Sequence, residues 1–436
     1  MDSAAGGGER WRSEKRMHKP PSTIQSLDHG IMCLIFASLD LFDLVRCSSV
    51  CKSWNLIINR SKLLYSLYKK QEGSDDPSSL STHSERSLNI YLEELAMHHH
   101  RFSLHEGSVF VEQWKGHAIG VDKCRMRMGL VLTGVGDKVM RLWSSESYKC
   151  LEEYSLSDMS PLVDFDFDES KIVGLVGTRI CIWRLSGNRS LFPSREGTFP
   201  KGICMRYVDP EAVVGCEDGT ARVFDMYSKK CSQIIRMQSG PVTCLYLGED
   251  HRIMSGSSLG SISVSDLSSD LQVVTLKSAD RAGIKTLCYN PSSHLLFAGS
   301  TYGCASCWDL RTMRMLWENR VSPNVIYTMQ NLQHDTSTLV VGGIDGVLRI
   351  LDQNTGDVLS RCVMQGGHGV PTSSSKSSYG AVETKRVERL LEDASIDSIP
   401  WTDRPPIKCL AVGMKKVITT HNGKYIRLWK FNKSME

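Results

Sequence analysis

The sequence predicts a mainly β chain preceded by a small all-α domain, and three observations lead to this fold class. A pattern close to Gly-x-x-Asp-x-x-x-x-Leu-Trp recurs between Gly134 and Trp429. Within each repeat, β-branched and aromatic residues alternate with Gly, Ser, Asn and Asp, which are strand and turn signals. Ahead of the repeats, residues 24–68 carry apolar side chains at helical spacing.

The repeats predict a seven-bladed β-propeller over residues 108–436. Consecutive repeats are 40 to 43 residues apart, except for a last gap of 78 residues. A period of about 40 residues with four short strands is typical of propeller blades. The repeats end at Trp143, Trp183, Phe224, Ser265, Trp308, Leu351 and Trp429. Residues 366–406 are rich in Ser and charge, so we expect a disordered insertion between blades six and seven.

The first and last strands of the repeat region are expected to share a blade. The last repeat ends near Phe431 with no fourth strand after it, whereas an extra strand pattern over residues 109–114 precedes the first repeat. We infer that this N-terminal strand completes the last blade. Such closure removes sheet edges that would otherwise pair with other chains.

The repeats resemble those of WD-repeat proteins, and the resemblance covers about 325 of the 436 residues. In that family a His, a Ser or Thr, an Asp and a Trp form a hydrogen-bonded network within a blade. The first blade matches this pattern with His117, Thr133, Asp137 and Trp143. We interpret the set as a structural network and not as a catalytic triad, because triads are recognised by geometry and no Gly-x-Ser-x-Gly elbow accompanies it.

The N-terminal region predicts three or four short amphipathic helices. Leu27, Ile31, Leu34 and Ile35 fall on one face of a first helix, and Asp43 lies where an N-cap would start the second. A third face carries Val50 and Trp54, followed by a Leu-rich end. A core built from about 45 residues is small, so we expect a partner surface.

Residues 22–68 resemble an F-box. The matching segments are Leu27-Asp28, Ile35-Phe36-Ala-Ser-Leu39, Asp43-Leu44, Val50-Cys51-Lys52-Ser53-Trp54 and Leu63-Leu64. The clear departure is Asp28, where the family has a Pro that helps to grip the adaptor. The resemblance implies a Skp-family adaptor as partner, bound through Leu27, Ile31, Leu34, Ile35, Phe36, Leu39, Leu44, Val50 and Trp54.

Two flanking segments complete the domain organisation. Residues 1–21 are expected to form a disordered basic tail. Residues 69–107 read as a linker whose first part is rich in Ser, Asp and Pro, and a helix is expected over residues 87–100.

Composition argues against several function classes. The net charge is only +4 and no basic stripe with interleaved aromatic residues occurs, so we expect no nucleic-acid partner. No apolar run of membrane length occurs, so we expect no membrane partner and a cytoplasmic or nuclear location. Of the 15 cysteines, Cys181, Cys204, Cys244, Cys288 and Cys409 occupy strand positions and are interpreted as small buried residues, and no matched Cys/His set accompanies them, so no metal site is expected. Without a phosphate loop or paired catalytic carboxylates, we expect no cofactor and no enzymatic activity.

The two resemblances together imply the substrate-recognition subunit of an SCF-type cullin–RING E3 ubiquitin ligase. The F-box would bind the Skp-family adaptor, and the propeller would hold a protein substrate near the ubiquitin-charged enzyme. Two alternatives remain. Trp308-Asp309-Leu310-Arg311 resembles the Trp-Asp-x-Arg signature of WD-repeat receptors for a different cullin class. The chain could also be a scaffold that promotes no ubiquitination.

The substrate is expected on the propeller face that carries the loops before each repeat's Asp position. The residues predicted to face this opening are Gly136, Glu217, Ser258, Thr301, Ile344 and Asn422. They include one acid and no Arg or Lys. Because recognition of phosphate favours clustered arginines, we predict a substrate that is not recognised chiefly through phosphate.

Overall fold

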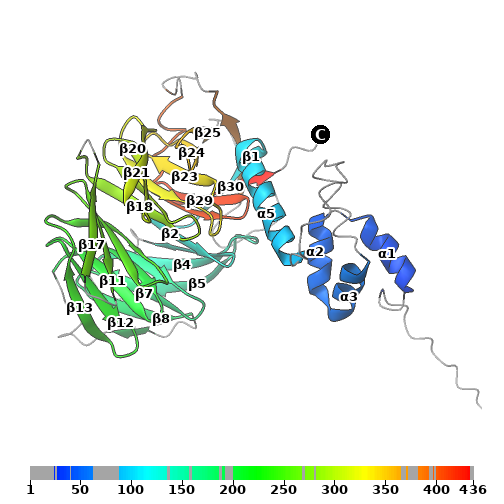
Figure 1. The fold of residues 1–436 in the computed structure, drawn as a ribbon, viewed down its shortest axis with the longest axis horizontal. Helices are drawn as coiled ribbons and strands as arrows, with labels where there is room; N and C mark the ends of the chain where they lie inside the picture. The colour runs from blue at the N-terminus through cyan, green and yellow to red at the C-terminus, as the bar shows by residue number, and fades with distance from the viewer. Residues whose placement is uncertain are drawn as a thin grey trace, which may run out of the picture. The chain divides into compact units, whose positions relative to one another are not determined.

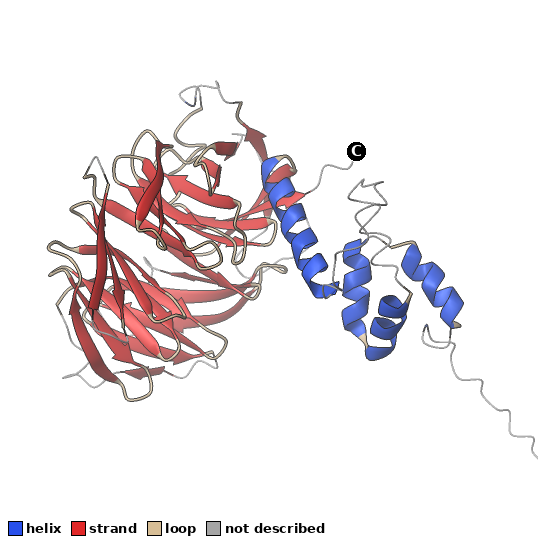
Figure 2. Ribbon diagram, viewed as in Figure 1, coloured by secondary structure: helices blue, strands red, loops and turns tan. Residues whose placement is uncertain are grey.

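The computed structural model describes residues 24, 27–39, 41–61, 88–134, 138–156, 160–185, 189–191, 200–267, 271–278, 281–364, 370–371, 382–391, 396 and 399–432. The chain divides into two units, Met1–Ala96 and Met97–Glu436. Helices make up the first unit and strands dominate the second, which confirms the predicted fold class (Figure 2). The predicted tail over residues 1–21 lies outside the described residues.

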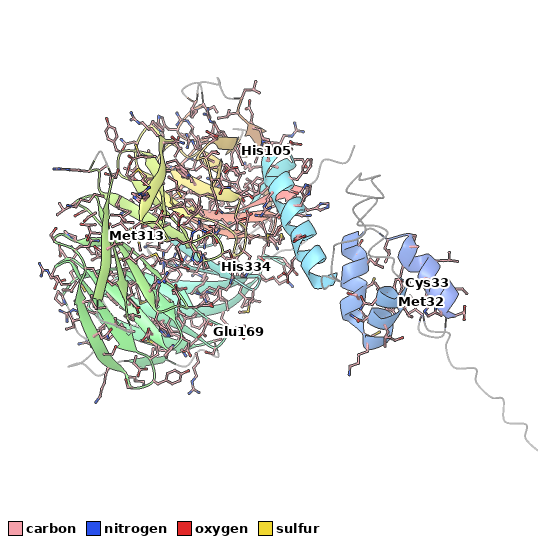
Figure 3. All side chains as sticks on the ribbon, viewed as in Figure 1. Met32, Cys33, His105, Glu169, Met313 and His334 are labelled. Carbon is pink, nitrogen blue, oxygen red and sulfur yellow. The ribbon has the colours of Figure 1, made fainter. Side chains whose placement is uncertain are left out.

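In the described part of the first unit, three short helices that precede α5 (Leu88–His105) surround a very small core. The helices are α1 (His29–Ala37), α2 (Leu41–Val50) and α3 (Lys52–Arg60). Met32, Phe36, Leu44 and Ile58 are buried together, and Trp54 packs edge-on against Phe36 with ring centroids 5.4 Å apart. Figure 3 labels Met32 on α1. Four buried side chains give a core too small for much intrinsic stability.

The second unit is built from antiparallel sheets in which each chain segment adds one blade. Blade one contains β2 (Lys123–Arg127), β3 (Leu130–Gly134), β4 (Val139–Ser144) and β5 (Cys150–Ser155). Blade two contains β6 (Leu162–Phe167), β7 (Lys171–Val176), β8 (Arg179–Arg184) and β9 (Arg189–Leu191). Blade three contains β10 (Gly202–Val208), β11 (Glu211–Cys216), β12 (Thr220–Asp225) and β13 (Lys230–Arg236). Blade four contains β14 (Val242–Leu247), β15 (Arg252–Ser257), β16 (Ser261–Asp266) and β17 (Leu271–Lys277). Blade five contains β18 (Ile284–Asn290), β19 (Leu295–Ser300), β20 (Cys304–Asp309) and β21 (Arg314–Arg320). Each of these blades is a four-stranded sheet in sequence order.

Blades six and seven share one ten-stranded sheet. Its strands are β22 (Ile326–Gln330), β23 (Thr338–Gly343), β24 (Leu348–Asp352), β25 (Val358–Met364), β26 (Val370–Pro371), β27 (Glu383–Arg389), β1 (Ser108–Lys115), β30 (Tyr425–Asn432), β29 (Lys416–Thr420) and β28 (Cys409–Gly413). Strand β1 pairs with β30 along its whole length and so forms the outer strand of blade seven. The expectation that the N-terminal strand closes the ring is confirmed.

Strand β27 differs from the prediction of a disordered insertion over residues 366–406. It pairs with β25 of blade six on one edge and with β1 of blade seven on the other. The two outer strands offer unpaired backbone groups, and a charged segment can satisfy them because sheet pairing does not need apolar side chains. Of the remainder, residues 366–369, 372–381, 392–395 and 397–398 lie outside the described residues.

The propeller core lies between neighbouring sheets. Val173 and Leu175 of blade two, for example, are buried against Met205 and Tyr207 of blade three. Similar apolar clusters join the other neighbouring blades, and Trp143, Trp183 and Trp429 are among the largest side chains buried in them.

Helix α5 (Leu88–His105) begins close to the predicted start at residue 87 and continues five residues beyond the predicted end at residue 100. Its C-terminal part belongs to the propeller unit (Figure 1). There Arg101 Nε lies 2.7 Å from Asp335 Oδ1, the Lys415 N–H donates to His100 Nδ1 at 3.0 Å, and Leu104 is buried beside Phe431. The end of the expected linker is therefore fixed to blades six and seven.

Within the described part of the chain, no helix combines the length and the apolar character needed to cross a membrane.

Candidate functional site

Helix α1 of the first unit is apolar on two neighbouring faces, and only one of them is used by the fold. Met32 and Phe36 point into the core. Ile31, Leu34 and Ile35 are exposed, Leu34 to 73% of its full area. An apolar helix face left in water by a small domain marks an interaction surface. We call the exposed residues Leu27, Ile31, Leu34, Ile35 and Val50 the apolar face of the first unit.

The predicted adaptor-binding residues fall into two groups. Those of the apolar face are exposed, and Val50 at the end of α2 is 63% exposed. Phe36 and Leu44 are fully buried, and Leu39 and Trp54 are partly buried against them. The sequence pattern mixes the groups because helical spacing alone does not show which of two apolar faces meets the core. Leu56 and Ile24 are also exposed, and the predicted adaptor-binding set does not include them. Their apolar side chains were the signal by which they could have been predicted.

Asp28, the departure from the expected pattern, is the N-cap of α1. Its backbone is extended, and its Oδ2 accepts a hydrogen bond from the Gly30 N–H at 3.0 Å. This contact satisfies one of the backbone donors that every helix start leaves free. The substitution therefore gives α1 a defined beginning, next to Leu27 of the apolar face.

In blade one, three of the four predicted network residues meet. The Trp143 indole N–H donates to Thr133 Oγ1 at 2.9 Å, and His117 Nε2 lies 2.8 Å from the same oxygen. Arg141 Nη1 lies 2.9 Å from His117 Nδ1. Asp137 lies outside the described residues. The shared hydroxyl joins the loop before the blade to its second and third strands, as expected for a structural network.

Blade seven contains a second network that the sequence reasoning missed. The Trp429 indole N–H donates to Thr419 Oγ1 at 2.9 Å, and His421 Nε2 lies 2.7 Å from that oxygen. His421 Nδ1 lies 3.1 Å from the Pro405 carbonyl. The His follows the Thr here instead of preceding it. The Thr-to-Trp spacing is the same as from Thr133 to Trp143, and that spacing was the available signal.

The predicted substrate-face residues occupy equivalent turns between the second and third strands of their blades. Gly136 lies outside the described residues. The backbone N–H groups of Glu217, Ser258, Thr301 and Ile344 each donate to a carbonyl in the loop that enters the blade. Glu217 is also paired with Lys201 at 3.6 Å. These turns therefore lie on one propeller face, and they fix the loops of that face.

A central channel of about 1850 Å³ runs between the innermost strands β2, β6, β10, β14, β18, β22 and β28. Of the predicted substrate-face residues, Asn422 lines it. Glu169 and His334, both labelled in Figure 3, line it as well. On the wall, buried Asp164 lies 3.1 Å from Arg125 Nη2 and 3.3 Å from Lys123 Nζ. This cluster could not be predicted from the sequence, because its members come from inner strands of different blades.

The segment that resembles a receptor signature for a different cullin class forms a tight turn after β20. Trp308 and Leu310 are buried. Arg311 Nε and Nη2 each lie 3.0 Å from an oxygen of Asp309. The guanidinium remains largely exposed, so the turn orients Arg311 at the surface.

In the part of the chain that the structure describes, no group of three or more His, Cys, Asp or Glu side chains is arranged to hold a metal ion. The inner-strand cysteines Cys204, Cys244, Cys288 and Cys409 are buried, as predicted. The networks of blades one and seven and the Asp164 cluster connect strands and loops of the propeller to one another.

Comparison with known proteins gives matches to both units. A family model described as F-box-like matches residues 29–70, and the model of the WD domain, G-beta repeat, matches residues 271–309. An F-box/WD-40 repeat-containing protein of Arabidopsis thaliana is 55% identical over 451 aligned residues, which cover 98% of this chain and 99% of the relative. A DENN domain and WD repeat-containing protein of the same plant is 27% identical over 34% of this chain and 13% of its own length.

Proposed function

Because the chain belongs to the F-box/WD-40 repeat-containing proteins, we propose that it is the substrate-recognition subunit of an SCF-type cullin–RING E3 ubiquitin ligase. The F-box would bind a Skp-family adaptor, and the propeller would bind the protein substrate. The chain would form no covalent bond itself. Its contribution would be the raised effective concentration of substrate lysines near the charged enzyme. Such a ligase subunit would work in the cytoplasm, the nucleus or both.

The observation that carries this proposal is the apolar face of the first unit. Leu34 is 73% exposed on a helix whose neighbouring apolar face already fills the core. Burying such side chains against an adaptor would gain roughly 1.5–3 kcal/mol for each fully buried Leu or Ile. The core of the unit is small, so the unit has little stability to spare. A second apolar face left in water adds no stability unless a partner covers it.

The direct test is co-purification of the full chain with a Skp-family adaptor. Leu34→Lys places an unpaired charge in the contact and should abolish adaptor binding. Leu259→Lys is the matched control, because Leu259 is an exposed Leu in the propeller unit. It should leave adaptor binding unchanged. Both residues are exposed, so both variants should keep the melting temperature of the parent protein.

Phe36→Glu would be a poor test of the contact, although Phe36 belongs to the family pattern. Its side chain is buried in the core, so a charge there would unfold the unit. Adaptor binding that survives Leu34→Lys would contradict the proposal. Co-purification of the adaptor of a different cullin, lost on Arg311→Ala, would favour the alternative that rests on the turn after β20.

A further inference from the structure

The charges on the wall of the central channel are unevenly distributed. Buried Asp164 on β6 is approached by three cations: Arg125 Nη2 at 3.1 Å, Lys123 Nζ at 3.3 Å and Arg206 Nη1 at 3.9 Å. The carboxylate also accepts hydrogen bonds from the N–H groups of Phe165 and Met205, at 3.0 and 3.2 Å. The one negative charge of Asp164 therefore faces three positive charges, and each of its two oxygens also accepts a backbone N–H.

Asp164 stays ionised under all physiological conditions. Burial alone would raise its pKa, but the three cations and the Met205 N–H outweigh burial and lower the pKa to about 2. The Asp164 carboxylate therefore offsets only one of the three cations around it. Inside the channel, such an excess of positive charge is screened less than at an open surface.

Two further lysines lie at the same end of the channel as Lys123. The inner strands all begin at the propeller face where the loops enter the blades. Lys123 is the first residue of β2, Lys285 the second of β18, and Lys408 immediately precedes β28. Lys408 Nζ lies 3.8 Å from the centroid of the Tyr327 ring. Among the described residues, neither Lys285 nor Lys408 has a carboxylate within ion-pair distance.

The acidic residues of the channel lie mainly toward its other end. The turns that follow the inner strands carry five of them: Asp168, Glu169, Asp209, Glu249 and Asp250. Deeper in the wall, Asp166 is 3.8 Å from Arg127. At the end with the lysines, Asp122 and Asp164 are the carboxylates that line the channel. An anion entering from the substrate face is thus attracted to that end of the channel.

We propose that the channel end carrying Lys123, Lys285 and Lys408 binds an acidic segment of the protein partner, through carboxylate side chains that enter the channel. This inference rests on the proposed function for its choice of a protein segment as the ligand. The volume of about 1850 Å³ exceeds that of a single side chain and admits a short stretch of chain.

The available donors favour carboxylates over phosphate groups. Phosphate is best held by the fork of a free guanidinium. Here Arg125 Nη1 donates to the Cys124 carbonyl at 3.1 Å and Nη2 to Asp164, while Arg206 Nη1 donates to the Met205 carbonyl at 3.0 Å. Both terminal nitrogens of Arg125 are therefore occupied, as is Nη1 of Arg206. The ammonium groups of Lys285 and Lys408 have no carboxylate partner among the described residues and are available to a ligand.

The test uses the full chain and a fluorescein-labelled peptide of about 12 residues, rich in Glu, against the same peptide with Gln in place of Glu. Fluorescence anisotropy should show binding of the Glu peptide alone, weakening as salt rises. The double variant Lys285→Gln and Lys408→Gln should weaken binding about tenfold or more. Lys408→Arg keeps the charge and should bind the Glu peptide about as tightly as the parent protein. Lys230→Gln, at an exposed position of β13, is the matched control and should change nothing.

Each outcome supports or overturns the inference. Absence of Glu-peptide binding, or equal binding by the double variant, would overturn it. Tripolyphosphate that binds with the same lysine dependence while the Glu peptide fails would also overturn it, because the site would then take a small polyanion. Adaptor co-purification is measured on the same variants. Failure of the parent chain to co-purify the adaptor would count against the proposed function, whereas intact adaptor binding with failed peptide binding would count against the channel site alone.

Discussion

Val111 in β1 lies directly opposite Trp429 in β30, so residues from the two ends of the propeller unit share one sheet. Both side chains are buried in the same cluster. The pairing continues from Ser108 opposite Asn432 to Lys115 opposite Tyr425. Strand β27 then pairs with the other edge of β1. The N-terminal strand is therefore held on both edges and closes the ring between the last blade and the insertion.

Deleting residues 1–115 should damage the propeller far more than deleting residues 1–70. Only the longer deletion removes β1, which leaves the edges of β30 and β27 unpaired and uncovers Trp429. The expected fall in melting temperature is more than about 10 °C beyond that of the shorter deletion, because several buried side chains are lost together. Differential scanning calorimetry of both truncated chains checks this. Equal melting temperatures would show that β1 does not carry ring closure.

The sequence was sufficient for the blades because their signals are local. The turn and the buried Trp that follows it lie within ten residues of sequence, as from Thr133 to Trp143. The number of blades and the position of β1 could therefore be predicted. Strand β27 could not, because its partners β25 and β1 are distant in sequence and its charged side chains carry no strand period. Pairing of this kind depends on backbone edges that exist only once the ring has formed.

The same difference between local signals and contacts of distant segments applies to the candidate sites. The helical spacing of Ile31 and Leu34 predicted an apolar face, but not that Phe36 would fill the core while Leu34 remained exposed. The channel cations Lys123, Lys285 and Lys408 belong to three different blades. Their side chains face one cavity only because the inner strands of all the blades run in the same direction around it. Sequence reasoning confined to the loops found none of them.

Asp28→Ala should loosen the start of α1. Removing an N-cap costs about 1 kcal/mol of helix stability, because the Gly30 N–H loses its acceptor. Hydrogen exchange of the α1 amides in the full chain should accelerate about fivefold. Asp28→Asn keeps a side-chain oxygen at the same position and should exchange nearly as slowly as the parent. If all three proteins exchange at the same rate, the cap contributes nothing measurable.

Thr133→Val and Thr419→Val should each destabilise the propeller by about 1–3 kcal/mol, because a buried indole N–H and a His ring lose their shared partner. Thr→Ser at either position keeps the hydroxyl and should recover most of the loss. Urea unfolding followed by tryptophan fluorescence gives these differences. A Val variant as stable as the Ser variant would mean that the hydroxyl is not needed by the network.

His100 should make the propeller unit less stable in mild acid. Burial lowers the pKa of His100 to about 4, and the nearby Arg101 and Lys415 act in the same direction, whereas Asp335 opposes them. The ring must be neutral at Nδ1, which accepts the Lys415 N–H. In the unfolded chain the pKa returns to about 6.5. Between these values the unfolded state binds more protons, so stability is complete above about pH 6.5 and is lost as the pH falls toward 4.

The measurement is the free energy of unfolding in urea at several pH values between 5 and 7.5. His100→Gln keeps an acceptor but cannot titrate, so its slope against pH should be shallower by up to about 1.4 kcal/mol per pH unit, the value for one proton. His251→Gln is the control, because His251 is largely exposed at the surface of blade four, and it should keep the parent slope. His421, whose pKa burial also lowers, contributes to the slope that remains. A His100→Gln slope equal to that of the parent would show that His100 does not titrate differently in the folded and unfolded chains.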